Sequence, residues 1–170
     1  MIAEARVGNV NRAYDYYMRI NPSAREEISE LHRCETYVYA QMIAGPDSVD
    51  SGEAKNSWLT GTAAWNYFAI TQWILGIRTL WDGLQIAPVI PQTWKGFKVE
   101  RKFRGVLYLI DVRREGRGNY VTLRADGKQV RGDVLPLPPP GCTDVKVEAV
   151  IGAEELGGEV VLRGVKGYHS

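Results

Sequence analysis

The feature that most constrains this fold is a change of hydrophobic pattern about halfway along the chain. In the first part, apolar residues such as Ala13, Tyr17 and Ile20 recur at helical spacing. In the second part, short apolar runs alternate with turn sequences, a pattern typical of β-strands. We therefore predict an α+β protein, with a helical part over residues 1–83 and a β domain over residues 84–170.

The strongest predicted helix runs from Thr60 to Gly76 and carries bulky side chains on every side. Such a helix is normally buried between other elements, so core packing is the favoured role of Trp65 and Trp73. The sequence supplies only part of the apolar surroundings that this helix requires. Further upstream, Ser23 followed by Glu26 predicts a capping box at the start of another helix.

The β domain is expected to form an antiparallel sandwich from short strands separated by turns. Asp126-Gly127 is a hairpin-type turn, and the run from Pro136 to Pro140 predicts a loop or a sheet edge. The predicted strands are Leu84–Ala87, Phe97–Phe103, Val106–Val112, Tyr120–Arg124, Lys128–Val130, Val145–Ala149 and Val160–Arg163.

Composition excludes several classes of protein. The 170 residues are 45% hydrophobic and 24% charged, which is unlike a disordered chain. A formal net charge of +1 argues against a protein that coats nucleic acid. The sequence contains neither a stretch long enough to cross a bilayer nor a signal peptide, and its two cysteines suit a reducing compartment. We expect a cytoplasmic protein that binds neither nucleic acid nor membrane.

Metal binding is not the favoured interpretation of the polar residues. The loop over residues 45–56 contains Asp47, Asp50 and Glu53, but their spacing is not that of an EF-hand, so a solvated acidic loop is favoured. His32 and Cys34 have no second pair of ligands that would complete a zinc site. We therefore expect neither a metal nor an organic cofactor.

The segment from Ser57 to Thr62 admits two interpretations. A Thr-Gly step at the start of a helix suits an anion, because backbone N–H groups at a helix N-terminus are unpaired. Threonine is also common at the N-cap position, so Thr60 could simply cap the helix, and capping is more frequent than anion binding. Trp58, at the edge of the loop, is the tryptophan best placed to contact a ligand. The basic residues from Arg101 to Arg104 are better explained as a solvated sheet face.

Several motifs together resemble glycoside hydrolase family 94. This family contains the inverting cellobiose, cellodextrin and chitobiose phosphorylases, with cyclic β-1,2-glucan synthases as relatives. The resemblance extends over roughly residues 1–150, as a continuous match without a large gap. The runs that carry it are YVYAQMIAG, GEAKNSWLTGTAAWNYFAITQWILGIR, WDG followed by LQIAPVIP, and FKV with FRG.

The resemblance implies a fold and a reaction. The chain is expected to comprise the last helices of an (α/α)6 catalytic barrel followed by a jelly-roll-like β-sandwich. The implied reaction is attack of inorganic phosphate, as co-substrate, on a β-linked glucan or chitin disaccharide or oligosaccharide, giving an α-sugar 1-phosphate. By correspondence of motifs, Thr60 and Gly61 are implied to contact phosphate, and Gln41 to bind the sugar at the cleaved bond.

The departures from the family pattern leave alternatives open. This sequence has no counterpart of the family's general-acid aspartate, and neither Glu35 nor Glu53 matches its position. It also has no counterpart of the arginine and histidine that complete the family's phosphate site. We therefore identify no catalytic residue and expect the chain alone to be inactive. It is then either one part of an enzyme completed by an upstream polypeptide or a non-catalytic module. Such a module would bind carbohydrate or self-associate as a homodimer.

Overall fold

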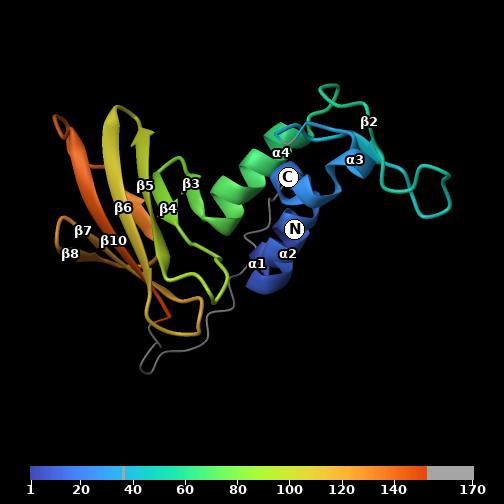
Figure 1. The fold of residues 1–170 in the computed structure, drawn as a ribbon. Helices are drawn as coiled ribbons and strands as arrows, with labels where there is room; N and C mark the ends of the chain where they lie inside the picture. The colour runs from blue at the N-terminus through green and yellow to red at the C-terminus, as the bar shows by residue number, and fades with distance from the viewer. Residues whose placement is uncertain (36, 153–170) are drawn as a thin grey trace, which may run out of the picture.

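A computed structural model describes residues 1–35 and 37–152, and it contains a helical part and a β part side by side (Figure 1). Helices and several sheets occur in succession along the chain, so the predicted α+β class is confirmed. The predicted strand Val160–Arg163 lies outside the described residues. Within the described part of the chain, no helix is long and apolar enough to span a membrane.

The first helices are short and amphipathic. They are α1 (Ile2–Arg6), α2 (Val10–Ile20), the 3-10 helix η1 (Pro22–Ile28) and α3 (Ser29–His32). The capping box expected from Ser23 is wrong, because the helix begins at Pro22 and the Asn21 Oδ1 atom accepts the Ser23 N–H at 3.3 Å.

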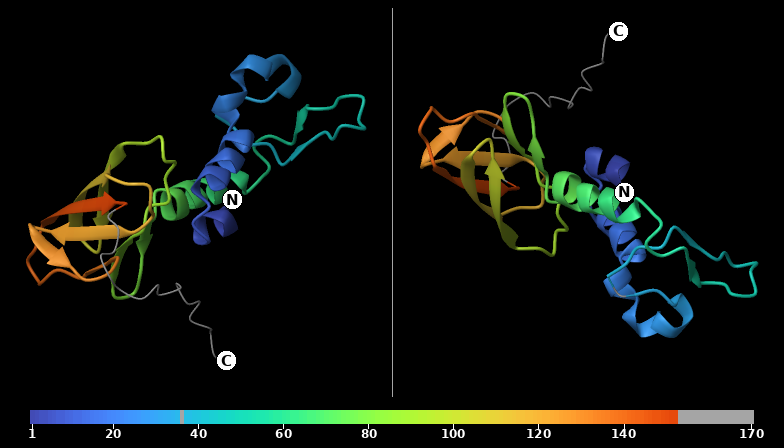
Figure 2. Two further views of the ribbon diagram at one scale, coloured as in Figure 1. Left: turned by 90° about the horizontal axis from the view of Figure 1, so that it is seen from below. Right: turned by 90° about the horizontal axis from the view of Figure 1, so that it is seen from above.

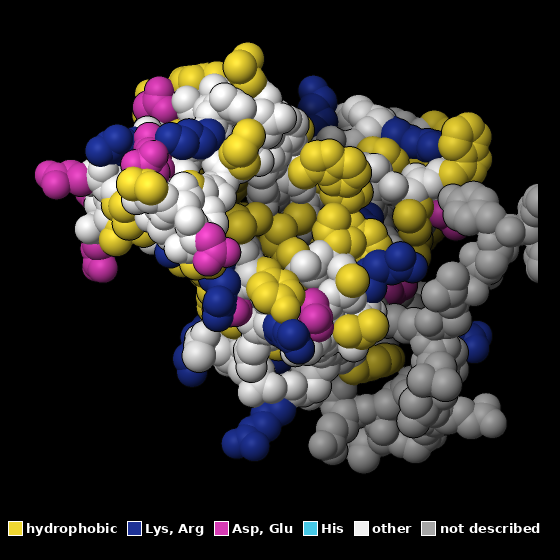
Figure 3. Space-filling view, turned by 90° about the vertical axis from the view of Figure 1, so that its right-hand side faces the viewer, with side chains coloured by type: hydrophobic (Ala, Val, Ile, Leu, Met, Phe, Trp, Pro, Cys, Tyr) yellow, Lys and Arg dark blue, Asp and Glu magenta, His cyan; other side chains and the backbone are white. Residues whose placement is uncertain are grey.

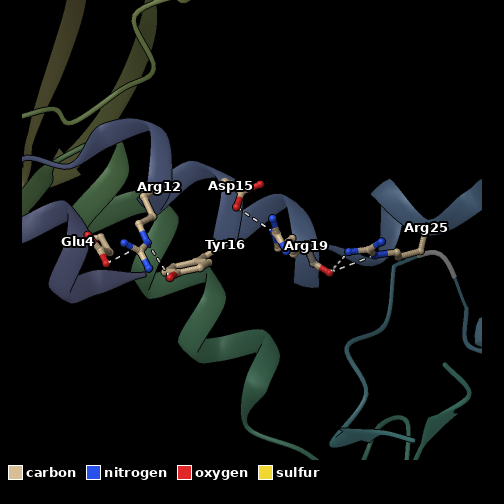
Figure 4. Close-up of polar contacts among 6 residues, drawn as sticks. All are labelled: Glu4, Arg12, Asp15, Tyr16, Arg19 and Arg25. Carbon is tan, nitrogen blue, oxygen red and sulfur yellow. Dashed lines mark hydrogen bonds and ion pairs between the residues drawn. The ribbon is translucent and has the colours of Figure 1, made fainter. Parts of the chain in front are cut away.

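Polar contacts cover the exposed side of α2, as Figure 4 shows. The Arg12 Nε atom donates to the Tyr16 hydroxyl at 2.8 Å, and the Arg19 Nε atom donates to Asp15 at the same distance. The Arg25 guanidinium donates to the Arg19 carbonyl near the end of α2. A helix leaves its last carbonyls unpaired, so this contact satisfies one of them and ties η1 to α2.

The long predicted helix is present but changes its geometry along its length. The segment α4 (Thr62–Phe68) is α-helical, and it continues as η2 (Ala69–Ile74), which is π-helical. Burial of Trp65 in a core is contradicted, since this side chain is 67% exposed. The buried side of the segment is formed instead by Asn66, Ala69 and Ile74.

The β part contains two sheets that share one apolar core. The smaller sheet is antiparallel, with the order β3 (Ile77–Thr79), β4 (Gly83–Ile86) and β9 (Val134–Pro136). The larger sheet has the order β5-β6-β10-β7-β8 and lies beside the smaller sheet (Figures 1 and 2). Inward side chains of both sheets belong to one core cluster. The strands of the larger sheet are β5 (Gly96–Phe103), β6 (Val106–Arg114), β7 (Val121–Ala125), β8 (Lys128–Val130) and β10 (Asp144–Ile151).

The expectation of purely antiparallel pairing is wrong for one pair of strands. β10 runs parallel to β6, with Val147 beside Ile110, and antiparallel to β7. Parallel neighbours require a long connection, and the chain between Arg114 and Asp144 supplies it through β7, β8 and β9. The sheet is therefore mixed.

The helical and β parts are joined by backbone contacts around Gly76. This residue has φ of +70°, and a Cβ atom on it would lie 2.1 Å from the Ala87 carbonyl oxygen. The Ala87 N–H donates to the Gly76 carbonyl at 2.9 Å, and the Val89 N–H to the Ile74 carbonyl at 2.8 Å. Val89 packs with Ala5, Val10 and Ala13 in a small second core. These contacts fix η2 against the first helices and the smaller sheet.

Candidate functional site

The start of α4 is the first part of the candidate site. The Thr60 Oγ1 atom accepts the Thr62 N–H at 3.0 Å and lies 2.6 Å from the Thr62 hydroxyl oxygen. The Gly61 carbonyl accepts the Trp65 N–H at 3.0 Å. The Thr60 hydroxyl therefore accepts one of the free N–H groups at this helix end. The interpretation of Thr60 as the N-cap residue is wrong, because Gly61 occupies the N-cap position.

Neither the backbone conformation nor the packing at position 61 requires a glycine. Its φ of −79° is available to every residue type. A Cβ atom built on Gly61 would meet only the Trp65 Cδ1 atom, at 3.9 Å, which is an ordinary contact. The absence of a side chain leaves the backbone at this helix end open to solvent.

Gln41 lies beside a short hairpin and is held by Asn56. The hairpin consists of β1 (Met42–Ile43) and β2 (Ala54–Lys55). The Asn56 Nδ2 atom donates to the Gln41 Oε1 atom at 3.1 Å, and the Gln41 N–H donates to the Lys55 carbonyl at 3.2 Å. Asn56 was not predicted from the sequence, and its φ of 56° is a conformation that asparagine adopts more readily than most residues.

A second group of side chains joins the chain before β1 to the chain after β2. The Trp58 Nε1 atom donates to the Glu35 Oε1 atom at 3.0 Å, and the Trp58 and Tyr37 rings meet edge to face at 6.3 Å. This N–H donor, together with the backbone N–H of Glu35, lowers the pKa of the Glu35 carboxyl below its ordinary value. Trp58 is 67% exposed, so much of its ring faces solvent. Trp65 is equally exposed and Trp81 more so, at 89%, so the role of Trp58 in ligand binding stays a prediction.

The acidic loop between β1 and β2 is partly neutralised by bases. The Lys55 Nζ atom lies 2.8 Å from the Glu53 carboxylate, and the Arg33 Nη1 atom lies 3.6 Å from it. The hydrogen bond from Lys55 is the main reason that the pKa of Glu53 is lowered. Within residues 1–35 and 37–152, no group of three or more His, Cys, Asp or Glu side chains is placed to hold a metal ion.

The basic strand lies away from these residues. Lys102 and Arg101 belong to β5, and Arg104 occupies the turn to β6. The Arg104 Nη2 atom donates to the Trp81 carbonyl at 2.8 Å, and its guanidinium lies over the Trp81 ring at 5.6 Å from the centroid. Arg104 therefore connects two turns of the β part.

The predicted site residues lie in two local groups. Gln41 is bonded to Asn56, and Thr60, next to Gly61, contacts Thr62. In the part of the chain that the structure describes, no hydrogen bond links one pair to the other. Their chemistry is that of amide and hydroxyl groups, which donate and accept hydrogen bonds but do not titrate near neutral pH. Such groups bind and orient hydroxyl or phosphate oxygens, whereas proton transfer requires another residue.

Comparison with known proteins identifies the relatives of this chain. Residues 1–76 match the family described as glycosyl hydrolase 94 superfamily, catalytic domain, which confirms the resemblance indicated by the motifs. The chain is 45% identical to N,N'-diacetylchitobiose phosphorylase of Vibrio furnissii over 111 residues, which are 65% of this chain and 14% of that protein. It is 35% identical to solabiose phosphorylase of Paenibacillus borealis over 145 residues, which are 84% of this chain and 19% of that protein.

A fungal protein is also similar. The chain is 38% identical to cellobionic acid phosphorylase of Neurospora crassa over 88 residues, which are 52% of this chain and 10% of that protein. The chain therefore spans less than a fifth of the length of each of these three curated relatives.

Proposed function

Because residues 1–76 match the catalytic domain of the glycosyl hydrolase 94 superfamily, we propose that this chain forms part of an inverting sugar phosphorylase. In the proposed reaction, inorganic phosphate cleaves a β-glucosidic bond of a disaccharide or oligosaccharide and gives an α-sugar 1-phosphate. The match to the catalytic domain over the residues that include Gln41, Thr60 and Gly61 is the observation that supports this function. The phosphorylases named above support the same class of reaction.

The proposal assigns the two parts of the chain to two domains of such an enzyme. Residues 1–83 would be the last helices of an (α/α)6 catalytic barrel, and residues 84–170 a jelly-roll-like β-sandwich domain. The apolar core shared by two sheets supports the second assignment. The exposed aromatic side chains of α4 support the first, since a barrel helix contacts neighbours on several sides.

The residue roles follow from the geometry of the hydroxyl and amide groups. Thr60 and Gly61 would contact phosphate through the threonine hydroxyl and the open backbone of the glycine. Gln41, held by Asn56, would donate to and accept from sugar hydroxyl groups. These contacts orient phosphate against the anomeric carbon, and orientation alone contributes substantially to the rate of a reaction between two substrates.

We also propose that the 170 residues alone are inactive. An inverting phosphorylase needs one carboxylic acid to protonate the leaving oxygen, whereas phosphate takes the place of the activated water. The hydrogen bond from Trp58 lowers the pKa of Glu35, whereas a general acid at neutral pH needs a raised pKa. Without a general acid, the rate falls by about 10²- to 10⁴-fold.

Phosphate-dependent turnover provides the test. The isolated chain and a chimera, in which it replaces the matched segment of solabiose phosphorylase, are incubated with phosphate and a panel of β-linked disaccharides. We expect sugar 1-phosphate from the chimera and none from the isolated chain. In the chimera, Thr60→Val should raise the KM for phosphate, whereas Thr71→Val provides the control, because its hydroxyl donates to the Tyr67 carbonyl within the helix. Equal KM values for the two variants would refute the role of Thr60.

The competing function is that of a non-catalytic module that binds carbohydrate or self-associates. The exposed rings of Tyr37 and Trp58 favour contact with a sugar in either case, because aromatic faces pack on sugar rings. Sugar binding therefore does not separate the two functions, whereas formation of a sugar 1-phosphate does. A chimera that binds sugars and never consumes phosphate would favour the module.

A further inference from the structure

The helical segment made of α4 and η2 is held mainly at its C-terminal end. The Ala69 and Ile74 side chains of η2 are buried, whereas Trp65 in α4 is exposed. Among the described elements, η2 packs against α1, α2 and β3, while the main contacts of α4 are with η2 itself. Figure 3 views the helical end of the molecule and shows hydrophobic side chains gathered around a hollow near its centre. The positions of Thr60 and Gly61, which precede α4, therefore depend on the contacts that hold η2.

Two arginines contact the Trp73 ring of η2. The Cζ atom of Arg78 lies 4.4 Å from the ring centroid, and that of Arg6 lies 5.6 Å from it. A guanidinium within about 6 Å of a tryptophan centroid is attracted by the electrostatic field of the ring. Since Arg6 ends α1 and Arg78 lies in β3, this ring connects η2 to both parts of the molecule.

Arg78 also donates hydrogen bonds to η2 and to β4. Its Nη1 atom donates to the Gln72 carbonyl near the end of η2 at 3.5 Å, and its Nε atom donates to the Gln85 Oε1 atom at 2.9 Å. The Gln85 Nε2 atom in turn donates to the Asp133 carboxylate at 2.9 Å. Because β4 is the central strand of the smaller sheet, these contacts join the end of the helix to that sheet. We call the contacts of Arg78 with Gln72, Trp73 and Gln85 the Arg78 clamp.

A helix carries a small movement at η2 to the start of α4. The two segments together span about 20 Å, so a tilt of about 3° about η2 displaces the start of α4 by about 1 Å. A displacement of about 1 Å at a reacting group lowers a rate by up to about 10²-fold. We propose that Arg78 is a positioning residue, which sets the tilt of the helix and so holds Thr60 and Gly61 in place for phosphate. This inference rests on the proposed function.

The KM for phosphate in the solabiose phosphorylase chimera tests the proposal. Arg78→Met removes the charge and the hydrogen bonds of the Arg78 clamp and keeps an unbranched apolar side chain. We expect this variant to raise the KM for phosphate by about 5-fold. The KM for the disaccharide should stay within about 2-fold, because Gln41 lies outside the helix.

Two milder variants follow the same contacts. Arg78→Lys keeps a positive charge near the Trp73 ring but lacks the planar fork of arginine, so its KM for phosphate should lie between those of the unmodified chimera and Arg78→Met. Gln85→Met removes the partner of Arg78 on β4 and leaves the arginine in place. It should also raise the KM for phosphate, by less than Arg78→Met does.

Arg104→Met is the matched control. The Arg104 guanidinium also lies over a tryptophan ring, that of Trp81, and donates to a backbone carbonyl, but it joins two turns of the β part. Its KM for phosphate should therefore stay within about 2-fold. Hydrogen exchange of the Leu75 N–H, which donates to the Ile70 carbonyl at 2.8 Å, reports on the end of η2 in the isolated chain. This exchange should be about 5-fold faster in Arg78→Met and unchanged in Arg104→Met.

Each contrary outcome is distinct. Equal KM values for phosphate in Arg78→Met and Arg104→Met would overturn the proposal. A lower kcat with both KM values unchanged would also overturn it, because a merely destabilised chimera loses active protein without a change in affinity. If the unmodified chimera forms no sugar 1-phosphate, the proposed function fails. In that case unchanged exchange of the Leu75 N–H in Arg78→Met would refute the Arg78 clamp as well, whereas faster exchange would leave the clamp intact.

Discussion

Replacing Gly76 by alanine tests how the helical part is attached to the β part. Two costs combine at this position. An L-residue at φ of +70° is disfavoured by about 1–2 kcal/mol. A Cβ atom would also lie 2.1 Å from the Ala87 oxygen and 2.3 Å from its carbonyl carbon, so the backbone must shift, which costs about 1–3 kcal/mol more. We predict that Gly76→Ala lowers the free energy of unfolding by about 3 kcal/mol.

A matched control separates the two costs. Gly127 has φ of +78°, but a Cβ atom on it would meet nothing within 4 Å. Gly127→Ala should therefore lower the free energy of unfolding by the conformational cost alone, about 1–2 kcal/mol. Urea unfolding followed by circular dichroism measures both variants. If Gly76→Ala lowers the free energy of unfolding no more than Gly127→Ala does, the Ala87 carbonyl oxygen does not crowd position 76. The predicted steric cost is then refuted.

Three further predictions concern local contacts. Trp58→Phe removes the N–H donor to Glu35, so the pKa of Glu35 should rise toward its ordinary value in an NMR titration, and an unchanged pKa would contradict the contact. Asn21→Ala should lower stability by about 1 kcal/mol through loss of the cap, and a neutral result in urea unfolding would show that the cap contributes nothing. The pKa of Glu53 in the folded chain is below its ordinary value of 4.5. The ionised Glu53 therefore stabilises the folded chain above pH 4.5, and this stabilisation is lost as the pH falls through the lowered pKa. A Lys55→Met variant should therefore lose less stability on acidification than the unmodified chain.

The strands with clear alternation were predictable from the sequence. The predicted Val145–Ala149 lies inside β10, where buried and exposed side chains alternate, because one face packs on the core and the other meets solvent. The three-residue strands β3 and β9 were missed, since so few residues give no periodic signal. The equally short β8 was predicted because it follows the Asp126-Gly127 turn. The parallel pairing of β10 with β6 was also missed, because hydrophobic alternation reports which face is buried and not which strand is the neighbour.

The candidate site was predictable only where its contacts are local. The sequence placed Thr60 at the start of the helix, and its hydroxyl does accept the N–H of Thr62, two residues away, although the N-cap position belongs to Gly61. The bond from Trp58 to Glu35 spans 23 residues, and that from Asn56 to Gln41 spans 15, so folding had to bring each pair together. The exposure of Trp65 was not predicted, because an all-round apolar helix gives no indication of which neighbours are present.

The central claim is that this chain supplies phosphate and sugar contacts to an inverting phosphorylase. The most direct measurement follows the sugar 1-phosphate formed by the solabiose phosphorylase chimera, with the anomer identified by NMR. We predict phosphate-dependent formation of the α-anomer, and a higher KM for phosphate in the Thr60→Val variant. A β-anomer, or release of free sugar without consumption of phosphate, would contradict it.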